Sequence, residues 1–289
     1  MNSSLILPPS SFHLGLTGYP LSHSLSPQIH AASLKACGLQ GDYSLFPIHP
    51  DDKQRLKDLL TRIRSGDLHG LNVTIPHKQN VIEFLDELTS TAKTIGAVNT
   101  IYLQGDKLIG DNTDAAGFLT DLRKFVNTDT SKQVNREALV LGAGGSARAV
   151  VYALLNDGWI VTIAARRIEQ AQHLASSLSN YQLQITGLTL PSLQSLISNL
   201  VLIVNTTPLG MTPNTDQSSL PENLSLPSNV FIYDLVYNPR ETKLVRDARA
   251  QGLSATTGLG ILIEQAALSF ELWTGCKPPS DVLRDAVQN

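Results

Sequence analysis

The chain has 289 residues, of which 42% are hydrophobic and 16% are charged. This length and composition exclude a disordered chain and fit two globular domains of ordinary size. The 22 Lys and Arg residues nearly balance the 25 Asp and Glu residues, which leaves a net charge of -3. Such a surface offers no basic field to nucleic acid or to an anionic membrane, so a small-molecule partner is favoured.

The sequence contains no targeting or metal-binding signal. Its apolar runs fall far short of the ~18 residues needed to span a bilayer, and residues 1–11 lack the basic segment of a secretory signal. We therefore expect a cytoplasmic protein without a membrane partner. Cys37 and Cys276 are too few for a disulfide framework and have no zinc-site spacing, so we interpret both as buried small hydrophobic residues and expect no metal.

In the first half of the chain, short strands alternate with amphipathic helices. A strand is predicted over 13–17, and Ser26 with Pro27 predicts the N-cap and first turn of a helix that ends near Gly38. The apolar spacing over 51–64 predicts a helix with one buried face. The other elements expected here are strands over 71–74 and 97–103, a hairpin strand over 107–110, and a helix from Thr113 or Asp114 to about Val126.

A polar, aperiodic segment over 127–137 predicts a domain boundary or an exposed turn. Beyond it, a strand over 138–141, a helix that ends at Asn156 and a strand over 159–164 predict a parallel βαβ unit. The elements expected after this unit are a helix over 169–178, strands over 200–205 and 230–235, a long loop over 208–227, and helices over 241–250, over 261–273 and after Pro279.

A glycine-rich turn stands where the first strand of this unit meets its helix. Residues 142–147 fit the pattern G-x-G-x-x-G/A in the strand-to-helix context that raises this motif above chance. Gly142 is expected to make the tight turn, Gly144 to let the backbone approach a pyrophosphate, and Ala147 to keep the helix close to the strand. The alternative is a tight turn without a ligand. The cofactor-binding residues expected here are Gly142, Ala143, Gly144, Gly145 and Ser146.

The end of the second strand indicates which dinucleotide binds. An NAD site carries an Asp or Glu about 20 residues after the glycines, but here the strand ends in Ala165, Arg166 and Arg167. Two guanidinium groups in this place suit a 2′-phosphate, so we expect the cofactor to be NADP. The alternative, above all for Arg167, is a solvated strand end.

Residues suited to chemistry gather in several separated motifs. In chain order these are GYPLSHSLSP over 18–27, NVTIPHK over 72–78, GAVNT over 96–100, GDNTD over 110–114, GAGGSAR over 142–148, YDLVYNP over 233–239, and GLG with EQAA over 258–267. Together they resemble the shikimate dehydrogenase family over almost the whole chain. The combination and its order are highly specific, whereas each motif alone is weak.

The resemblance implies a two-domain α/β oxidoreductase that reversibly reduces 3-dehydroshikimate to shikimate with NADP, a step of aromatic amino-acid and chorismate biosynthesis. It places a substrate domain over 1–114, completed by the C-terminal helices over 258–289. A Rossmann-like NADP-binding domain with a parallel sheet is expected over 115–257. We expect a monomer or a homodimer.

The resemblance also assigns roles to single residues. Lys78 matches the catalytic lysine, and hydride delivery to a ketone leaves an alkoxide that a cationic acid can protonate. Asp114 matches the aspartate paired with that lysine; a surface salt bridge is the alternative. Ser24 and Ser26 match residues that bind the substrate carboxylate, although Ser26 also fits a helix N-cap. The other matches are substrate contacts at Thr74, Asn99, Tyr237 and Gln265, with a core role as the alternative for Tyr237, and positions at the nicotinamide end at Leu235 and Gly258.

Two other functions stay open at this point. An enzyme of the same family would act on quinate as well, and a metabolite sensor on this fold would bind its ligand without transferring hydride. The presence of both Lys78 and Asp114 disfavours the sensor. The sequence departs from the family at Ala165, where Asn is usual, at Gln170, where a basic residue is common, and at Ala31, where Asn is frequent.

Overall fold

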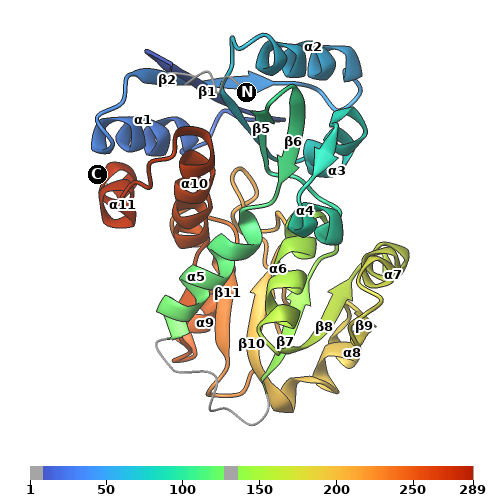
Figure 1. Cartoon of the computed structure of the whole chain (residues 1–289). Helices are drawn as coiled ribbons and strands as arrows, with labels where there is room; N and C mark the ends of the chain where they lie inside the picture. The colour runs from blue at the N-terminus through green and yellow to red at the C-terminus, as the bar shows by residue number, and fades with distance from the viewer. Residues whose placement is uncertain (1–8, 127–135, 289) are drawn as a thin grey trace. The chain divides into compact units, whose positions relative to one another are not determined.

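The computed structural model describes residues 9–126 and 136–288, and Figure 1 shows the elements in chain order. The described chain forms two compact units. Unit 1 takes its residues from Met1–Leu88, Val98–Asp111 and Ala266–Asn289, and unit 2 from Thr89–Ala97 and Asn112–Gln265. Residues 1–8, which were considered for a targeting signal, and most of the polar segment over 127–137 lie outside the described residues.

Unit 1 is built on a mixed sheet with the strand order β2-β1-β3-β5-β6-β4. The strand β1 pairs in parallel with β2 and β3, whereas β5 is antiparallel to both β3 and β6. The strands are β1 (Phe12–Gly18), β2 (Gly41–Pro47), β3 (Gly70–Val73), β4 (Glu87–Leu88), β5 (Thr100–Gln104) and β6 (Lys107–Asp111). The helices are α1 (Ser26–Ala36), α2 (Lys53–Arg64), α3 (His77–Asn80), the 3₁₀ helix η1 (Val81–Phe84) and α11 (Ser280–Gln288).

The core of unit 1 lies between its sheet and the helices that cover it. The predicted apolar stripe of α2 is confirmed, and this helix packs against β5 and β6. Another cluster joins β1 to α1 and to the C-terminal part of α10 (Leu259–Thr274), with the buried members Phe12, Leu14, Leu34, Phe270 and Trp273. Gly70 is required beneath this cluster, because a Cβ there would lie 2.4 Å from the indole ring of Trp273.

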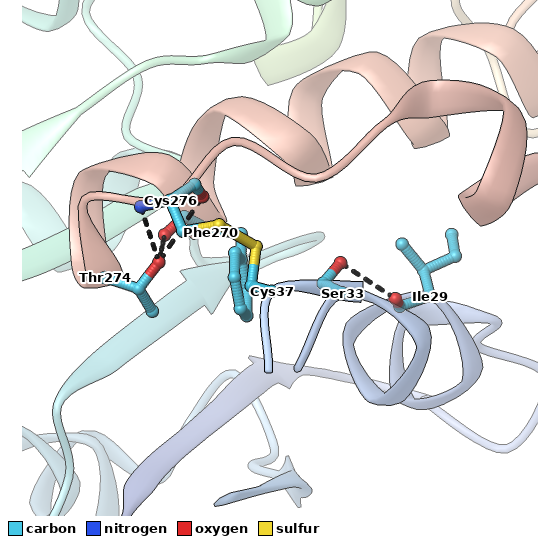
Figure 2. The surroundings of a disulfide bond; sticks show 6 residues. All are labelled: Ile29, Ser33, Cys37, Phe270, Thr274 and Cys276. Carbon is cyan, nitrogen blue, oxygen red and sulfur yellow. Dashed lines mark hydrogen bonds between the residues drawn. A yellow bond between two sulfur atoms is a disulfide. The ribbon is translucent and has the colours of Figure 1, made fainter. Parts of the chain in front are cut away.

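The two cysteines are bonded to each other, so their interpretation as buried hydrophobic residues is wrong. Figure 2 shows the disulfide between Cys37, which follows α1, and Cys276, which follows α10. Both residues are only partly buried. They lie 239 residues apart in sequence, and they meet because α1 and α10 join the same apolar cluster. Since no local pattern reports such a long-range encounter, cysteine counting alone missed the bond.

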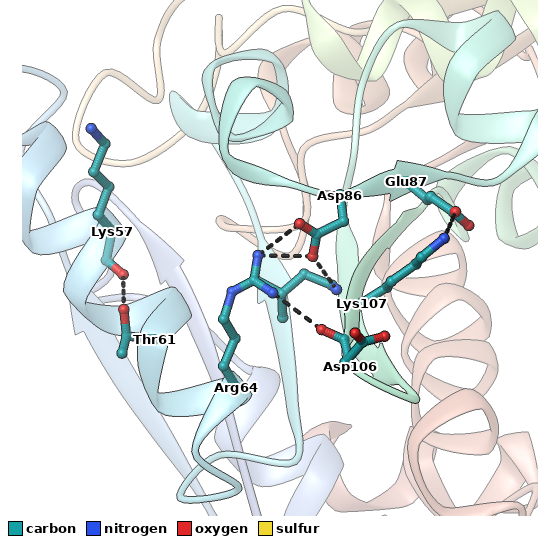
Figure 3. A network of polar contacts seen from close by, with 8 residues as sticks. Lys57, Thr61, Arg64, Asp86, Glu87, Asp106 and Lys107 are labelled. Carbon is teal, nitrogen blue, oxygen red and sulfur yellow. Dashed lines mark hydrogen bonds and ion pairs between the residues drawn. The ribbon is translucent and has the colours of Figure 1, made fainter.

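A network of polar contacts joins the end of α2 to the β5–β6 hairpin (Figure 3). Arg64 forms an ion pair with Asp86 at 2.8 Å and donates a hydrogen bond to the carbonyl of Asp106 at 3.2 Å. The pKa of Asp86 is lowered, first because its carboxylate accepts a hydrogen bond from the backbone N–H of Leu108 and also because Arg64 lies beside it. Lys107 pairs with Glu87 on the neighbouring strand β4. Both ion pairs are exposed to solvent.

Unit 2 contains a wholly parallel sheet with the order β12-β11-β10-β7-β8-β9. Numbered within the unit, this is the order 3-2-1-4-5-6 that is typical of doubly wound dinucleotide-binding sheets. The strands are β7 (Glu137–Leu141), β8 (Ile160–Ala165), β9 (Leu183–Gly187), β10 (Leu200–Asn205), β11 (Phe231–Asp234) and β12 (Ala255–Thr256). The helices are α4 (Ser90–Ile95), α5 (Asp114–Val126), α6 (Gly145–Asn156), α7 (Ile168–Ser177), α8 (Leu190–Gln194), the 3₁₀ helix η3 (Ile197–Asn199) and α9 (Lys243–Ala250).

The sheet of unit 2 is buried on both faces, as a parallel sheet requires. Ala138 and Val140 of β7 belong to a cluster that includes buried residues of α5, α6 and α7. Leu139 and Leu141, which point to the opposite face, belong to a cluster that includes buried residues of α8 and α9. The predicted α/β class with a Rossmann-like domain is confirmed. Among the described residues, no helix combines the length and apolarity needed to cross a membrane.

The division of the chain differs from the expected domain limits in three segments, which are residues 89–97, 112–114 and 258–265. The segment Thr89–Ala97 belongs to unit 2, where Arg148 of α6 donates a hydrogen bond to the carbonyl of Ile95 at 3.2 Å. The N-terminal part of α10 also belongs to unit 2, and its Ile261 lies in the same cluster as α5 and α6. Packing between elements, rather than the order of motifs, sets these limits.

Candidate active site

The glycine-rich turn connects the end of β7 to the start of α6 in unit 2. Gly142 has a φ of +112°, and a Cβ there would lie 2.7 Å from the hydroxyl oxygen of Thr206. That hydroxyl in turn donates a hydrogen bond to the carbonyl of Leu141 at 2.7 Å. Thr206 follows β10, so the turn lies where the strand order reverses between β7 and β10. Ligands of doubly wound sheets bind at this reversal point.

Gly144 supplies an independent test of whether a dinucleotide fits the turn. It immediately precedes α6 and has an extended backbone that any residue can adopt. No heavy atom lies within 4 Å of the position that its Cβ would take. Neither the backbone nor the packing of the described chain therefore requires glycine here, and a close approach by a phosphate group gives a reason for it. The partly buried Ala143, Gly145 and Ser146 form the rest of the turn.

The arginine pair stands at the same edge of the sheet as the turn. Ala165 ends β8, which pairs directly with β7, and Arg166 and Arg167 follow it. Both arginines are exposed. Within 9–126 and 136–288 neither guanidinium has an ion pair or a side-chain hydrogen bond. Both charges are thus available to a phosphate group outside the chain.

The structure brings Leu235 and Gly258 together. The N–H of Gly258 donates to the carbonyl of Val236 at 3.1 Å, and a Cβ on Gly258 would lie 2.0 Å from the carbonyl oxygen of Leu235. The N–H of Leu235 donates to the carbonyl of Asn205, at the end of the adjacent strand β10. Leu235 and Gly258 are therefore in close contact beside the strand ends, and a side chain on Gly258 would clash with the backbone of Leu235.

The buried carboxylate of Asp234, which was not among the site residues expected from the sequence, lies beside this contact. Asp234 accepts hydrogen bonds from the side chains of Asn205 at 2.8 Å and Thr242 at 2.7 Å, and from the N–H of Val236 at 3.0 Å. Burial raises the pKa of Asp234 to about 6, although the three hydrogen bonds oppose this shift. The sequence did contain a signal for this pair, because Asn205 and Asp234 are each a polar residue at the end of a buried strand.

Asp114 opens α5 of unit 2 and is 7% exposed. Two residues before Asp114, the side chain of Asn112 accepts a hydrogen bond from the N–H of Ala115 and donates one to the carbonyl of Ala97 at 2.9 Å. Later in the same helix, Gly117 lets α10 approach, because a Cβ there would lie 2.7 Å from the backbone nitrogen of Gln265. The expected substrate residues Asp114 and Gln265 thus lie on neighbouring helices. Tyr237 is partly buried in the loop after β11.

In unit 1, the serine pair lies at the start of α1. Ser26 is the first helical residue and Leu25 is the N-cap, so the predicted capping role of Ser26 is wrong. The hydroxyl of Ser24 accepts a hydrogen bond from the N–H of Ser26 at 3.2 Å and so satisfies one N–H group of the first helical turn. Ser24 is partly buried and Ser26 is 6% exposed. Both hydroxyl groups belong to one turn of the chain.

Lys78 lies in α3, which follows the strand β3 after the three connecting residues 74–76, the first of them Thr74. Its side chain is 9% exposed, which is rare for a lysine without a function or a partner. The N–H of Val98 donates to the carbonyl of Lys78 at 2.7 Å, and the N–H of Val73 donates to the carbonyl of Asn99 at 2.8 Å. Thr74, Lys78 and Asn99 are therefore neighbours in unit 1, whereas Asp114 belongs to unit 2.

The described residues contain no group of three or more His, Cys, Asp or Glu side chains placed to hold a metal ion.

Comparison with sequence families accounts for most of the chain. Residues 16–101 match the family described as shikimate dehydrogenase substrate binding domain, residues 124–247 match shikimate / quinate 5-dehydrogenase, and residues 258–288 match shikimate 5′-dehydrogenase C-terminal domain. The chain is 38% identical to shikimate dehydrogenase (NADP(+)) of Bacillus subtilis over 94% of this chain and 95% of that protein.

Solved structures agree with these matches. The crystal structure of shikimate 5-dehydrogenase from Thermus thermophilus, in complex with NADP(H) and shikimate, is similar with a TM-score of 0.83 and 35% identity over 96% of this chain and 98% of that chain. Quinate dehydrogenase from Corynebacterium glutamicum, in complex with NAD, is similar with a TM-score of 0.85 and 30% identity over 96% of this chain and 99% of that chain.

Proposed function

The chain belongs to the shikimate dehydrogenase family, and we propose that it reversibly reduces 3-dehydroshikimate to shikimate with NADP, using Lys78 as acid/base and Asp114 as its partner. Unit 2 then binds the cofactor, and unit 1 supplies the lysine and most of the substrate contacts. This reaction is a step of aromatic amino-acid biosynthesis.

One observation supports the cofactor half of the proposal most strongly. The turn at Gly142 and Gly144 lies at the reversal point of the sheet, and the exposed Arg166 and Arg167 follow the adjacent strand. An anion at the start of α6 is stabilised by free N–H groups, and a second phosphate suits the guanidinium pair. When bound, the cofactor supplies the hydride. Leu235 and Gly258 would line its nicotinamide end.

The chemistry of the protein itself is proton transfer. Hydride addition to a ketone produces an alkoxide, and the ammonium group of Lys78 donates the proton that converts it to the hydroxyl group. In the reverse direction the neutral amine accepts that proton. Asp114 stabilises the charged lysine and accepts a hydrogen bond from a ring hydroxyl.

Binding of the substrate requires donors and acceptors around a polyhydroxylated ring. Ser24 and Ser26 would bind its carboxylate, because their hydroxyl groups share one turn at the start of α1. The other proposed contacts are Thr74, Asn99, Tyr237 and Gln265.

One experiment tests the proposal and its closest alternative together. Nicotinamide absorbance is followed with shikimate or quinate, each with NADP⁺ or NAD⁺. We expect the highest kcat/KM with shikimate and NADP⁺. The similarity to a quinate dehydrogenase makes quinate the necessary comparison; preference for quinate would replace the proposed substrate. Absence of turnover with every pair would favour a sensor.

We infer a cytoplasmic enzyme that is a monomer or a homodimer. Fractionation of the source cells and light scattering of the purified chain test these two statements, and a membrane-bound or larger species would contradict them.

A further inference from the structure

The side chain of Asp121 in α5 contacts both of the segments that meet at Leu235 and Gly258. The hydroxyl of Tyr233, two residues before Leu235, donates a hydrogen bond to Oδ2 of Asp121 at 2.6 Å. On the other side, a Cβ on Gly260, two residues after Gly258, would lie 1.9 Å from Oδ1 of Asp121. The carboxylate therefore lies directly against the first turn of α10 and beside the end of β11. All of these residues belong to unit 2.

Two aromatic contacts hold the ring of Tyr233 beside this carboxylate. The ring lies edge-on to Phe118, with centroids 5.2 Å apart, and to Phe125, with centroids 6.1 Å apart. Both phenylalanines belong to α5, so the helix that carries Asp121 also contacts the ring of Tyr233. Tyr233 is 0% exposed and Asp121 is 7% exposed. Because both groups are shielded from solvent, loss of their hydrogen bond incurs a desolvation cost that water does not offset.

Two glycines allow α5 and α10 to approach this closely. Gly117 and Asp121 are four residues apart and lie on one face of α5. A Cβ on Gly117 would lie 2.7 Å from the backbone nitrogen of Gln265, and the carboxylate of Asp121 occupies the place that a Cβ on Gly260 would need. Glycine in a helix is unfavourable relative to alanine, so its presence at both positions indicates a packing requirement. A carboxylate also suits the first turn of α10, because the N-terminus of a helix carries partial positive charge.

We propose that Asp121 and Tyr233 are positioning residues, which set the place of Leu235 relative to Gly258 and through them the orientation of the nicotinamide ring. One carboxylate contacts the chain two residues away from each of these positions, so a displacement of either segment breaks a buried contact. Because hydride transfer requires close alignment of the reacting atoms, a small displacement of the ring lowers kcat. This inference rests on the proposed placement of the nicotinamide beside Leu235 and Gly258.

The first test is the binding of two ligands to Tyr233→Phe, which keeps the aromatic ring and removes the hydroxyl. Calorimetry measures the Kd for NADPH and for adenosine 2′,5′-bisphosphate, a fragment of the cofactor that lacks the nicotinamide. We expect the Kd for NADPH to rise roughly 3- to 10-fold, as for the loss of one hydrogen bond to the nicotinamide, and the Kd for the fragment to stay unchanged. Equal rises for both ligands would mean general damage to unit 2 and would overturn the positioning role, as would two unchanged values.

Tyr181→Phe is the matched control for this variant. The hydroxyl of Tyr181 also donates a hydrogen bond of 2.6 Å within unit 2, to Oδ1 of Asn156, and its ring packs against the cluster that contains Tyr233. We expect Tyr181→Phe to match the wild type in the Kd for NADPH and in kcat. In contrast, Tyr233→Phe should lower kcat with shikimate roughly 5- to 30-fold and leave the KM for shikimate nearly unchanged. Equal effects of the two variants on kcat would contradict the proposal.

Asp121 provides a second pair of variants from a different element. Asp121→Asn keeps the size of the side chain and an oxygen that can accept from Tyr233, so it should keep most of the wild-type kcat and NADPH affinity. Asp121→Ala removes the acceptor and should lower both at least as far as Tyr233→Phe does. Wild-type kcat and NADPH affinity in Asp121→Ala would overturn the proposal.

Leu235→Ala separates the inference from the proposed function. This variant removes the side chain that is expected beside the nicotinamide, so it should weaken the binding of NADPH and leave that of adenosine 2′,5′-bisphosphate unchanged. Weakened NADPH binding in Leu235→Ala, together with wild-type binding and kcat in Tyr233→Phe, would overturn the positioning role alone. Wild-type NADPH binding in Leu235→Ala would instead remove the nicotinamide from this place, and the proposed cofactor contact would fall together with the inference.

Discussion

The side chain of Asn205 donates a hydrogen bond to the carboxylate of Asp234 across 2.8 Å, at the point where β10 and β11 end side by side. Both residues are 0% exposed. Because the N–H of Leu235 also donates to the carbonyl of Asn205, this pair fixes the start of the loop that we propose to line the nicotinamide end. The buried carboxylate of Asp234 therefore helps to hold this loop in place.

Asp234 should make the stability of the protein depend on pH. Burial raises the pKa of its carboxyl group from 3.8 to about 6, so the folded state binds this proton more tightly than the unfolded state does. The free energy of unfolding should therefore fall as the pH rises from about 4 to about 6, by about 2–3 kcal/mol. Urea unfolding of the wild type and of Asp234→Asn at several pH values measures this contribution as the difference between the two curves. Parallel curves would refute it.

The elements that were predicted from sequence share a local signal. The strands β7 and β8 are continuous apolar runs, and α6 lies between a glycine-rich turn and Asp157-Gly158. In contrast, β2 and β9 were missed. They are edge strands with no fully buried residue, and their alternation of apolar and polar residues, as in LQIT over 183–186, covers only a few positions and is a weak local signal. Their pairing partners, which no local pattern contains, determine their conformation.

The same distinction applies to the candidate site. Lys78 and the glycine-rich turn were found because their motifs are contiguous in sequence. The buried hydrogen bonds that join the side chains of Asn72, Ser269 and Thr100 were not found from the sequence, because these residues are far apart in the chain and each is an ordinary polar residue in a strand or helix. Ser24 shows an intermediate case: the motif identified the residue, but the structure was needed to show that it accepts the N–H of Ser26.

Replacement of Lys78 by Ala should lower kcat by ~10²–10⁴, the usual contribution of a positioned acid/base, with little change in NADP binding. Lys35→Ala, which removes an exposed lysine of α1, is the control for loss of one positive charge. Steady-state kinetics and cofactor titration measure both effects. Near-normal turnover in folded Lys78→Ala would exclude the proposed role.

Ser24→Ala and Ser26→Ala should each lower kcat/KM. The loss of transition-state stabilisation should be ~1.5–3 kcal/mol, because each variant removes a charge-assisted hydrogen bond to the substrate carboxylate. The methyl ester of shikimate should be a poor substrate of the wild type, and the double Ala variant should discriminate less between acid and ester. If the ester lost no more activity with the wild type than with the double variant, the carboxylate would bind elsewhere.

The disulfide should stabilise unit 1. Closing a loop of 239 residues restricts the unfolded chain, and such cross-links contribute about 2–4 kcal/mol. Cys37→Ser combined with Cys276→Ser should therefore lower the free energy of unfolding, and reduction with dithiothreitol should destabilise the wild type but leave the double variant unchanged. Identical unfolding curves for the oxidised and reduced wild type would contradict the bond.

Arg166→Ala tests the choice of cofactor. A 2′-phosphate carries nearly two charges and accepts forked guanidinium bonds, whereas NAD⁺ offers only a hydroxyl group there. Each charge-assisted bond contributes ~1.5–3 kcal/mol, or roughly 10- to 150-fold in affinity. The KM for NADP⁺ should therefore rise by ~10-fold or more, while kcat and the activity with NAD⁺ stay almost unchanged.

The exposure of both arginines adds a second signature to this prediction. Because salt screens exposed charges, the advantage of the wild type over Arg166→Ala should shrink at high ionic strength. Arg55→Ala, which removes an exposed arginine of α2, should have no such effect. Steady-state kinetics with both cofactors at two salt concentrations measures this difference between the wild type and the variants. A wild type that prefers NAD⁺, or a variant that loses both cofactors equally, would show that the arginine pair is a solvated strand end and that the 2′-phosphate binds elsewhere.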